Sequence, residues 1–132
     1  MLAGALKKKR DHTPVLMRLA QLASNAGRHA EAQRYLRQIL EHEPANVEAR
    51  LELGKSLFET GDVAGALRET NAILNTDPDH AEALYNLGAI YGNLGNARMA
   101  QQHWNRLIAV APESESGRQA KQMIAQLPPV AR

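Results

Sequence analysis

The sequence predicts an all-α protein, a solenoid of antiparallel helix pairs with about seven helices. The composition is rich in the helix-forming residues Ala, Leu, Gln, Arg and Glu, and only 4% of residues are aromatic. Strands of β proteins normally use more aromatic and β-branched residues. The second observation is an internal repeat, because prolines occur at positions 44, 78 and 112, a constant step of 34 residues. A chain of 132 residues has the size of one domain.

Three further residue types recur with the same step. They are leucine at 19, 53 and 87, glycine at 27, 61 and 95, and alanine at 32, 66 and 100. Glycine is expected to end the first helix of each unit, and the residue before each proline to end the second. The small residues at positions 20, 54 and 88 are expected to face the alanines at 32, 66 and 100, which lets two helix backbones approach closely. One pair cannot bury its own apolar surface, so the pairs must stack.

The first unit illustrates how each pair is expected to begin and end. Thr13 is expected to cap the first helix with Pro14 in its first turn, and this helix runs to Ala26. A second helix begins near His29 and ends at Glu43. Equivalent units follow at 47–80 and 81–114. The residues expected to cap later helices are Asn46, Asp62, His80, Asn96 and Ser114.

The C-terminal segment 114–127 is expected to form a helix that caps the last repeat. Ala120, Met123, Ile124 and Leu127 lie on one stripe, and prolines 128 and 129 end the helix. The predicted organisation is therefore a basic N-terminal segment at 1–12, one repeat domain at 13–127 and a short tail at 128–132.

The third unit resembles the tetratricopeptide repeat family. The residues that carry the resemblance are Leu84, Leu87, Gly88, Tyr91, Ala100, Trp104, Leu107 and Pro112. The first unit departs from the family at Ala20 and Ala23, and the second at Arg50 and Thr70. The resemblance implies a right-handed superhelix that acts as a non-enzymatic protein–protein interaction scaffold or adaptor, with a peptide or a partner helix bound in its concave groove.

By the same resemblance, the groove is lined by the first helix of each unit. The implied groove residues are Met17, Arg18, Gln21 and Ser24, then Leu51, Glu52, Lys55, Phe58 and Glu59, and finally Tyr85, Asn86, Ala89 and Asn93. Phe58 and Tyr85 are the expected anchors, because aromatic side chains in a groove often dominate peptide binding. The alternative for Phe58 is packing against a neighbouring helix.

One subclass of the family grips the C-terminal carboxylate of chaperones with lysine, arginine and asparagine side chains. The positions that would carry this clamp are here Met17, Gln21, Glu52, Glu82 and Asn86. Two of them are acidic and none is basic, so the resemblance disfavours carboxylate binding by this chain.

The sequence contains no recognisable catalytic motif. The chain has no cysteine, which excludes disulfides and thiolate chemistry. The five histidines have no metal-ligand spacing, and no serine or glycine-rich segment matches a nucleophile or phosphate-binding motif. We therefore expect no enzyme activity, no cofactor, no metal and no small-molecule substrate.

The only run of charge is basic and consists of Lys7, Lys8, Lys9 and Arg10. It accounts for the formal net charge of +2, and the rest of the chain is mildly acidic. The run is either a solvated segment or a contact with an anionic surface. In the second case the chain is the soluble part of a membrane-tethered bacterial assembly factor, or, less favoured, a nucleic-acid binder. We expect a cytoplasmic location, or a periplasmic or membrane-associated one if an anchor precedes Met1.

Overall fold

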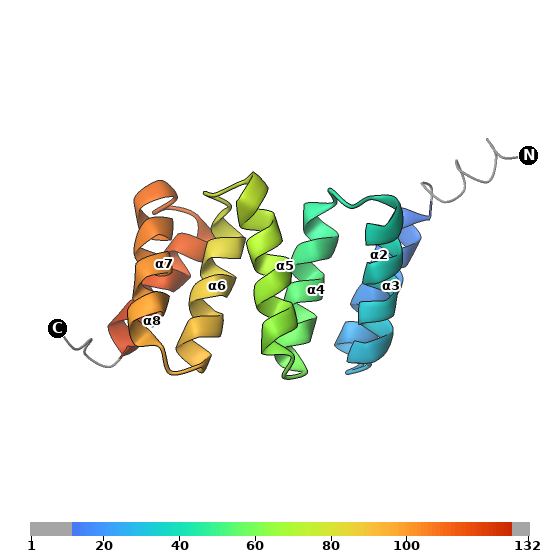
Figure 1. Cartoon of the computed structure of the whole chain (residues 1–132), viewed down its shortest axis with the longest axis horizontal. Coiled ribbons are helices and arrows are strands. Elements are labelled where there is room, and N and C mark those ends of the chain that lie inside the picture. The colour runs from blue at the N-terminus through green and yellow to red at the C-terminus, as the bar shows by residue number, and fades with distance from the viewer. Residues whose placement is uncertain (1–11, 128–132) are drawn as a thin grey trace, which may run out of the picture. The chain divides into compact units, whose positions relative to one another are not determined.

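The computed structural model describes residues 12–127, and this range forms seven helices and no strand (Figure 1). The helices are α2 (Thr13–Asn25), α3 (His29–His42), α4 (Val47–Glu59), α5 (Val63–Thr76), α6 (Ala81–Asn93), α7 (Ala97–Val110) and α8 (Glu115–Gln126). The predicted all-α helical repeat is confirmed.

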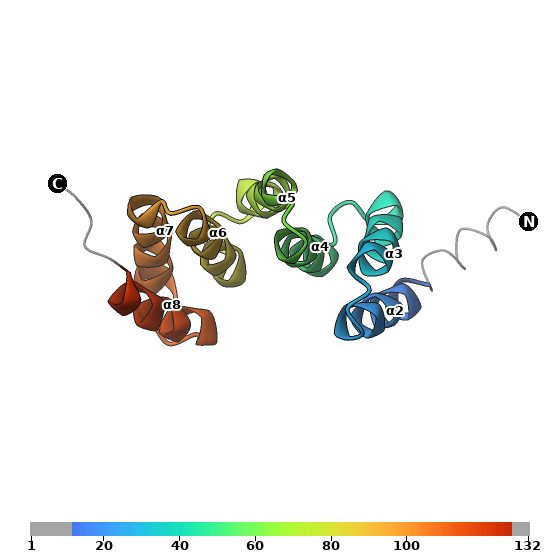
Figure 2. The ribbon, with the colours of Figure 1, turned by 90° about the horizontal axis from the view of Figure 1, so that it is seen from below.

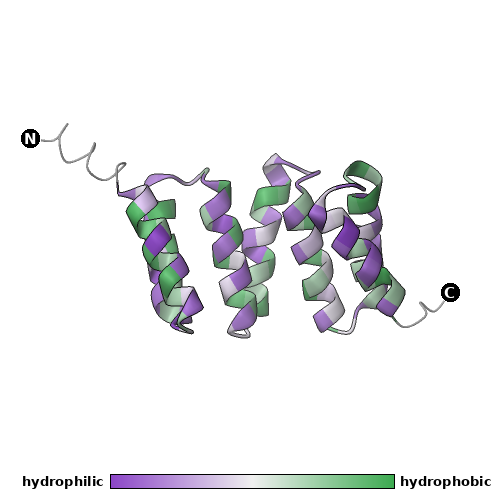
Figure 3. Cartoon of the chain, turned by 180° about the vertical axis from the view of Figure 1, so that it is seen from behind, coloured by the Kyte–Doolittle hydropathy of each residue, from purple (hydrophilic) through white to green (hydrophobic). Residues whose placement is uncertain are grey.

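The chain divides into two compact units between Asp62 and Val63. Unit 1 contains α2, α3 and α4, with α3 packed against both of the others. Unit 2 contains α5 to α8, and in it α6 packs against α5, α7 and α8. Figure 2 shows α8 lying against α7 at the C-terminal end of this unit. Each helix carries hydrophobic and hydrophilic residues, as expected for helices with one buried face (Figure 3).

Three glycines end the first helices of the repeats, as the sequence predicts. Gly27, Gly61 and Gly95 have φ angles of +78°, +88° and +79°. A Cβ atom at any of them would meet no atom within 4 Å, so a larger side chain would fit in the available space. Glycine is favoured here by the backbone conformation, because a left-handed residue with a side chain costs roughly 1–2 kcal/mol.

Four of the predicted helix caps are confirmed by side-chain hydrogen bonds. Asn46, His80, Asn96 and Ser114 each accept a hydrogen bond from the backbone N–H three residues later, at 2.9, 3.2, 3.1 and 2.9 Å. These bonds satisfy backbone donors that the first turn of a helix leaves unpaired.

The prediction that Thr13 caps the first helix is wrong. His12 occupies the cap position and makes no capping hydrogen bond with its side chain, while Thr13 is the first helical residue. The Thr13 hydroxyl instead donates to the carboxylate of Glu43, which links the start of α2 to the end of α3. The cap positions 12, 46, 80 and 114 are therefore equally spaced.

The core of unit 2 is centred on Trp104. This residue forms a buried cluster with Leu84, Ala100, Leu107 and Ala120, to which α6, α7 and α8 all contribute. The indole Nε1 donates a hydrogen bond to the carbonyl oxygen of Tyr85 at 3.1 Å. The capping stripe of α8 is confirmed as a packed face, because Met123, Ile124 and Leu127 contact this cluster.

At Gly88, which is expected to face Ala100, the nearest atoms belong to Trp104. A Cβ atom at Gly88 would lie 2.6 Å from Cδ1 and Cε2 of Trp104. Gly92, one turn later, is the residue opposite Ala100, at 3.8 Å between the two Cβ positions. The indole lies directly against Gly88, so this glycine makes room for the ring.

The interface between α3 and α4 in unit 1 contains a buried polar contact. Gln33 Nε2 donates to Ser56 Oγ at 3.1 Å and lies 3.3 Å from Thr60 Oγ1. The buried apolar residues of unit 1 include Ala23, Ile39 and Leu57. The hydrogen bonds offset the cost of burying the amide.

His103 on α7 is half-buried and lies against an aromatic ring. Its ring stacks on Tyr91 with 5.6 Å between centroids and 13° between planes. Burial lowers the pKa of His103 below its ordinary value of 6.5, because desolvation disfavours the charged form.

We expect the free energy of unfolding to fall as the pH drops below about 6.5, since the unfolded chain then takes up a proton more readily than the folded one. The loss is complete below the pKa of the folded state. Denaturant titrations at several pH values between pH 8 and pH 5, roughly the range where histidine titrates, measure this effect. His103→Gln should flatten the profile, and an unchanged profile in this variant would contradict the assignment.

Candidate functional site

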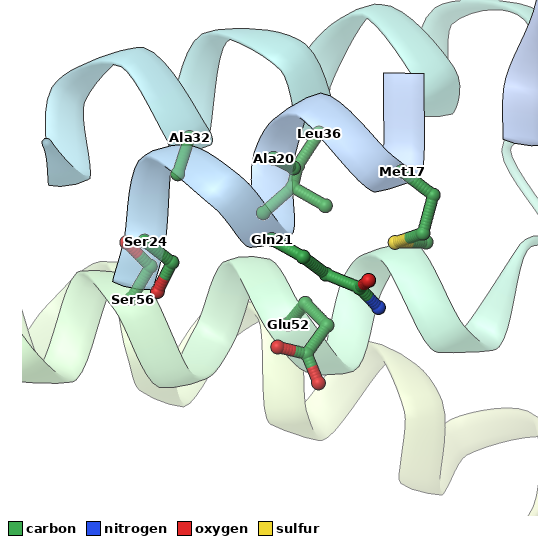
Figure 4. Close-up of a pocket in the computed structure, with 8 residues that line it drawn as sticks. All are labelled: Met17, Ala20, Gln21, Ser24, Ala32, Leu36, Glu52 and Ser56. Atoms are coloured by element: carbon green, nitrogen blue, oxygen red, sulfur yellow. The ribbon is translucent and has the colours of Figure 1, made fainter. Parts of the chain in front are cut away.

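A pocket in unit 1 brings together residues of α2, α3 and α4 (Figure 4). The residues that line it are Met17, Ala20, Gln21, Ser24, Ala32, Leu36, Glu52 and Ser56. Helical spacing explains the set, because Met17, Gln21 and Ser24 share one face of α2, and Glu52 and Ser56 share one face of α4.

The floor of the pocket is apolar and its rim is polar. Ala20, Ala32 and Leu36 are buried core residues. Figure 4 shows Met17 at one end, Ser24 and Ser56 at the other, and the Gln21 amide and Glu52 carboxylate between them. An apolar floor with a few convergent polar groups is typical of a binding site.

The size of the pocket limits what it can hold. Its volume is about 20 Å³, whereas pockets for small molecules usually measure about 300–1,000 Å³. The pocket therefore fits the end of one side chain or a methyl group, and not a cofactor. A ligand held here must gain most of its contacts from the surrounding surface.

The charge at the rim is a single carboxylate. Glu52 Oε1 lies 3.5 Å from Lys55 Nζ, one turn along α4. Both side chains are solvent-exposed in part, so this pair contributes little to stability. Among residues 12–127, no lysine or arginine lines the pocket. A partner therefore meets one negative charge, the Gln21 amide and two hydroxyl groups.

The structure brings four of the predicted groove residues together and leaves the other residues of unit 1 outside the pocket. Met17, Gln21, Ser24 and Glu52 line it. Arg18 is exposed on α2. Glu59 Oε2 lies 3.7 Å from His29 Nε2.

The apolar groove candidates on α4 are less accessible than the pocket rim. Leu51 has only 7% of its surface exposed, so it offers little area to a partner. Phe58 is half-buried. This exposure is intermediate between that of an open groove anchor and that of a side chain packed fully against a neighbouring helix.

The candidates on α6 belong to unit 2. Tyr85 and Ala89 pack against the cluster around Trp104, and the Tyr85 and Trp104 rings lie 6.0 Å apart at an angle of 30°. Asn86 is half-buried and Asn93 is exposed. Part of the Tyr85 ring is therefore packed inside unit 2.

Four residues of the pocket were not predicted as groove residues. Ala20, Ala32 and Leu36 have the sequence pattern of core positions, which gives no sign that they also face a cavity. Ser56 could have been found, because it follows Glu52 by four residues and lies on the same face of α4.

The predicted basic contact at Lys7–Arg10 lies outside the described residues. Within residues 12–127, none of the helices combines the length and apolar character required to span a bilayer.

The fold defines an all-α helical-repeat protein with a small pocket in unit 1. Two family models described as tetratricopeptide repeat match the chain, one at residues 23–85 and one at residues 70–102. The chain belongs to the tetratricopeptide repeat family. No curated protein matches it in sequence.

Three solved structures illustrate the likeness. YrrB, described as a TPR protein with an unusual peptide-binding site, is 26% identical with a TM-score of 0.74, and the match covers 83% of this chain and 57% of YrrB. The first TPR of Spaghetti (RPAP3), bound to the HSP90 peptide SRMEEVD, is 17% identical with a TM-score of 0.75 over 88% of this chain and 92% of that one.

The third structure is part of an enzyme. A mutant O-GlcNAc transferase from Thermobaculum terrenum is 22% identical with a TM-score of 0.76, and the match covers 88% of this chain but only 22% of the enzyme. At these identities, the likeness to Spaghetti and to the transferase concerns the fold alone.

Proposed function

We propose that this protein binds a peptide or a partner helix on the face of unit 1 that contains the pocket, and that its role is binding without catalysis. The observation that carries the proposal is the pocket itself, where an apolar floor from α2 and α3 lies beneath Gln21 and Glu52. The family resemblance predicts binding on the first helices of the repeats, and YrrB supports the proposal as a related structure with a peptide-binding site.

The partner is expected to insert one small apolar side chain over Ala20, Ala32 and Leu36. The Gln21 amide can donate to and accept from the partner backbone, and Glu52 can accept from it. The remaining predicted groove residues of unit 1 complete the proposed surface around this anchor.

The carboxylate of Glu52 also predicts which peptides are rejected. The peptide bound to Spaghetti, SRMEEVD, carries several carboxylates. Met17, Gln21 and Glu52 occupy three of the positions at which the family resemblance places the lysine, arginine and asparagine side chains of a carboxylate clamp. A desolvated like charge disfavours the wrong partner, so SRMEEVD should bind poorly to this chain.

Filling the pocket tests the proposal. Ser24 lies at one end of the pocket and is half-buried, so Ser24→Phe should occupy the cavity without disturbing the floor. Peptides selected from a random library on the wild-type protein should bind this variant roughly tenfold more weakly, a loss expected for a blocked anchor site. Fluorescence anisotropy with labelled peptides measures the change.

The matched control is Asn25→Phe, which adds the same ring to an exposed position of the same helix outside the pocket. It should leave the affinity unchanged, and SRMEEVD serves as the negative peptide. Thermal unfolding checks that both variants are folded. Equal affinity of Ser24→Phe and the wild type would show that the pocket is not the binding site.

A further inference from the structure

The polar side chains at the rim of the pocket have few partners in the described part of the chain. Gln21 and Ser24 make no side-chain hydrogen bond to any other residue in the range 12–127. Glu52 has a single contact in that range, the ion pair of 3.5 Å with Lys55. An amide, a hydroxyl group and a carboxylate are therefore available to a bound peptide.

The charge of the rim is negative. Glu52 is the one charged residue among those of 12–127 that line the pocket. Its side chain is 36% exposed, so a peptide on this face takes further water away from the carboxylate. The loss of that water costs free energy unless a donor or a cation replaces it. The lining itself supplies only uncharged donors.

Lys55 is a weakly held partner of this carboxylate. Its side chain is 45% exposed, and it lies one turn from Glu52 on the same helix. Exposed pairs of this kind contribute little free energy, and the long lysine side chain can turn its ammonium group back into water. A cation on a bound peptide can therefore replace Lys55 at low cost. Arg18, on α2, does not line the pocket.

We propose that the peptide bound at this pocket is basic, an inference that rests on the proposed function. The small apolar side chain enters the pocket, and a lysine or arginine of the peptide takes the place of Lys55 beside Glu52. The two peptide residues share one face, so they stand two positions apart in an extended peptide and three or four apart in a helix. The Gln21 amide and the Ser24 hydroxyl bind the peptide backbone.

Arginine is the better of the two basic residues for this site. The contact of Glu52 with Lys55 is made through Oε1. A guanidinium group can hold both oxygens of a carboxylate in a planar, bidentate arrangement, whereas an ammonium group acts as a point charge. Peptides selected on this protein should therefore contain arginine at least as often as lysine beside the small residue.

Peptide binding at about 0.15 M salt tests the proposal, because this salt concentration screens distant charges. Peptides selected from a random library on the wild-type protein should be enriched in lysine and arginine. One selected peptide is compared with a version whose basic residue is replaced by glutamine, by fluorescence anisotropy. The basic version should bind roughly tenfold more tightly, as close charge pairs at interfaces do. Glu52→Gln should abolish this difference, which completes a double-mutant cycle.

Two further variants distinguish a specific pair from general attraction. Glu48→Gln is the matched control, since it removes the same charge one turn earlier on α4, at an exposed position outside the pocket. It should preserve the tenfold difference between the two peptides. Lys55→Gln removes the competing cation and should strengthen binding of the basic peptide roughly two- to threefold, in keeping with a weak exposed pair.

The variant Ser24→Phe separates this proposal from the proposed function. If it weakens both peptides while Glu52→Gln leaves their difference intact, the pocket binds the peptide and the pairing with Glu52 is refuted. The pairing is also refuted if basic residues are not enriched, or if Glu48→Gln removes the difference as fully as Glu52→Gln. If Ser24→Phe weakens neither peptide, the proposed binding site is wrong, and the pairing at Glu52 is wrong with it.

Discussion

Replacing Trp104 by alanine should destabilise unit 2 by about 3–5 kcal/mol, the usual range for removing a buried tryptophan. Trp104 is 1% exposed and joins α6, α7 and α8 in one cluster. Its loss leaves a cavity beside Leu84, Leu107 and Ala120 and removes the hydrogen bond to the Tyr85 carbonyl. Native domains are stable by only about 5–15 kcal/mol, so this loss is a large share of the total.

Urea titration followed by far-ultraviolet circular dichroism measures this effect, since Trp104 is the only tryptophan and its removal abolishes the fluorescence signal. Trp104→Leu is the control, because leucine stands at the corresponding position 36 in the first repeat. It should cost clearly less than alanine. A loss below about 1 kcal/mol for Trp104→Ala would mean that the indole is not part of the core.

Gly88→Ala should destabilise the protein by about 1–3 kcal/mol, as expected for inserting a methyl group into a filled core. The new Cβ atom would lie 2.6 Å from two atoms of the Trp104 ring. A buried indole cannot move aside as the end of a flexible side chain can. The chemical midpoint of unfolding, read from tryptophan fluorescence, should therefore fall.

Gly92→Ala is the matched control on the same helix. Its Cβ atom would have ordinary contacts, 3.7 Å from Trp104 Cη2 and 3.8 Å from Ala100 Cβ. Because alanine has the better helix propensity, this change should stabilise the protein by up to about 1 kcal/mol. In a Trp104→Leu background, Gly88→Ala should lose most of its cost. Effects of equal sign at both glycines would refute the placement of the indole on Gly88.

The local signals of helix ends were readable in the sequence. Glycines 27, 61 and 95 end helices because only the backbone of glycine adopts a positive φ at low cost, which depends on no other residue. The caps at Asn46 and Ser114 likewise act within one turn. The cap of α2 is harder to predict, because His12 and Thr13 are adjacent and both lie just before Pro14. The hydrogen bond between Thr13 and Glu43 joins two helices, so no local pattern predicts it.

The residues that pack against small side chains cannot be predicted from such local patterns. Gly88 was expected to face an alanine, but the bulk of Trp104 across the helix pair decides what lies there. Similarly, Leu19 and Leu53 are equivalent by sequence, yet their exposed fractions are 36% and 2%. Whether a neighbouring helix covers such a position is a property of the assembled repeats.

The repeat, the helices and the family resemblance follow from the order of the residues, because a period of 34 residues and its capping signals are properties of the linear chain. The pocket that Met17, Gln21 and Glu52 form over Ala32 and Leu36 is visible only in the folded protein. These residues come from three helices, and the cavity between them is the volume that their side chains fail to fill. That volume follows from packing in three dimensions, which a linear pattern does not specify.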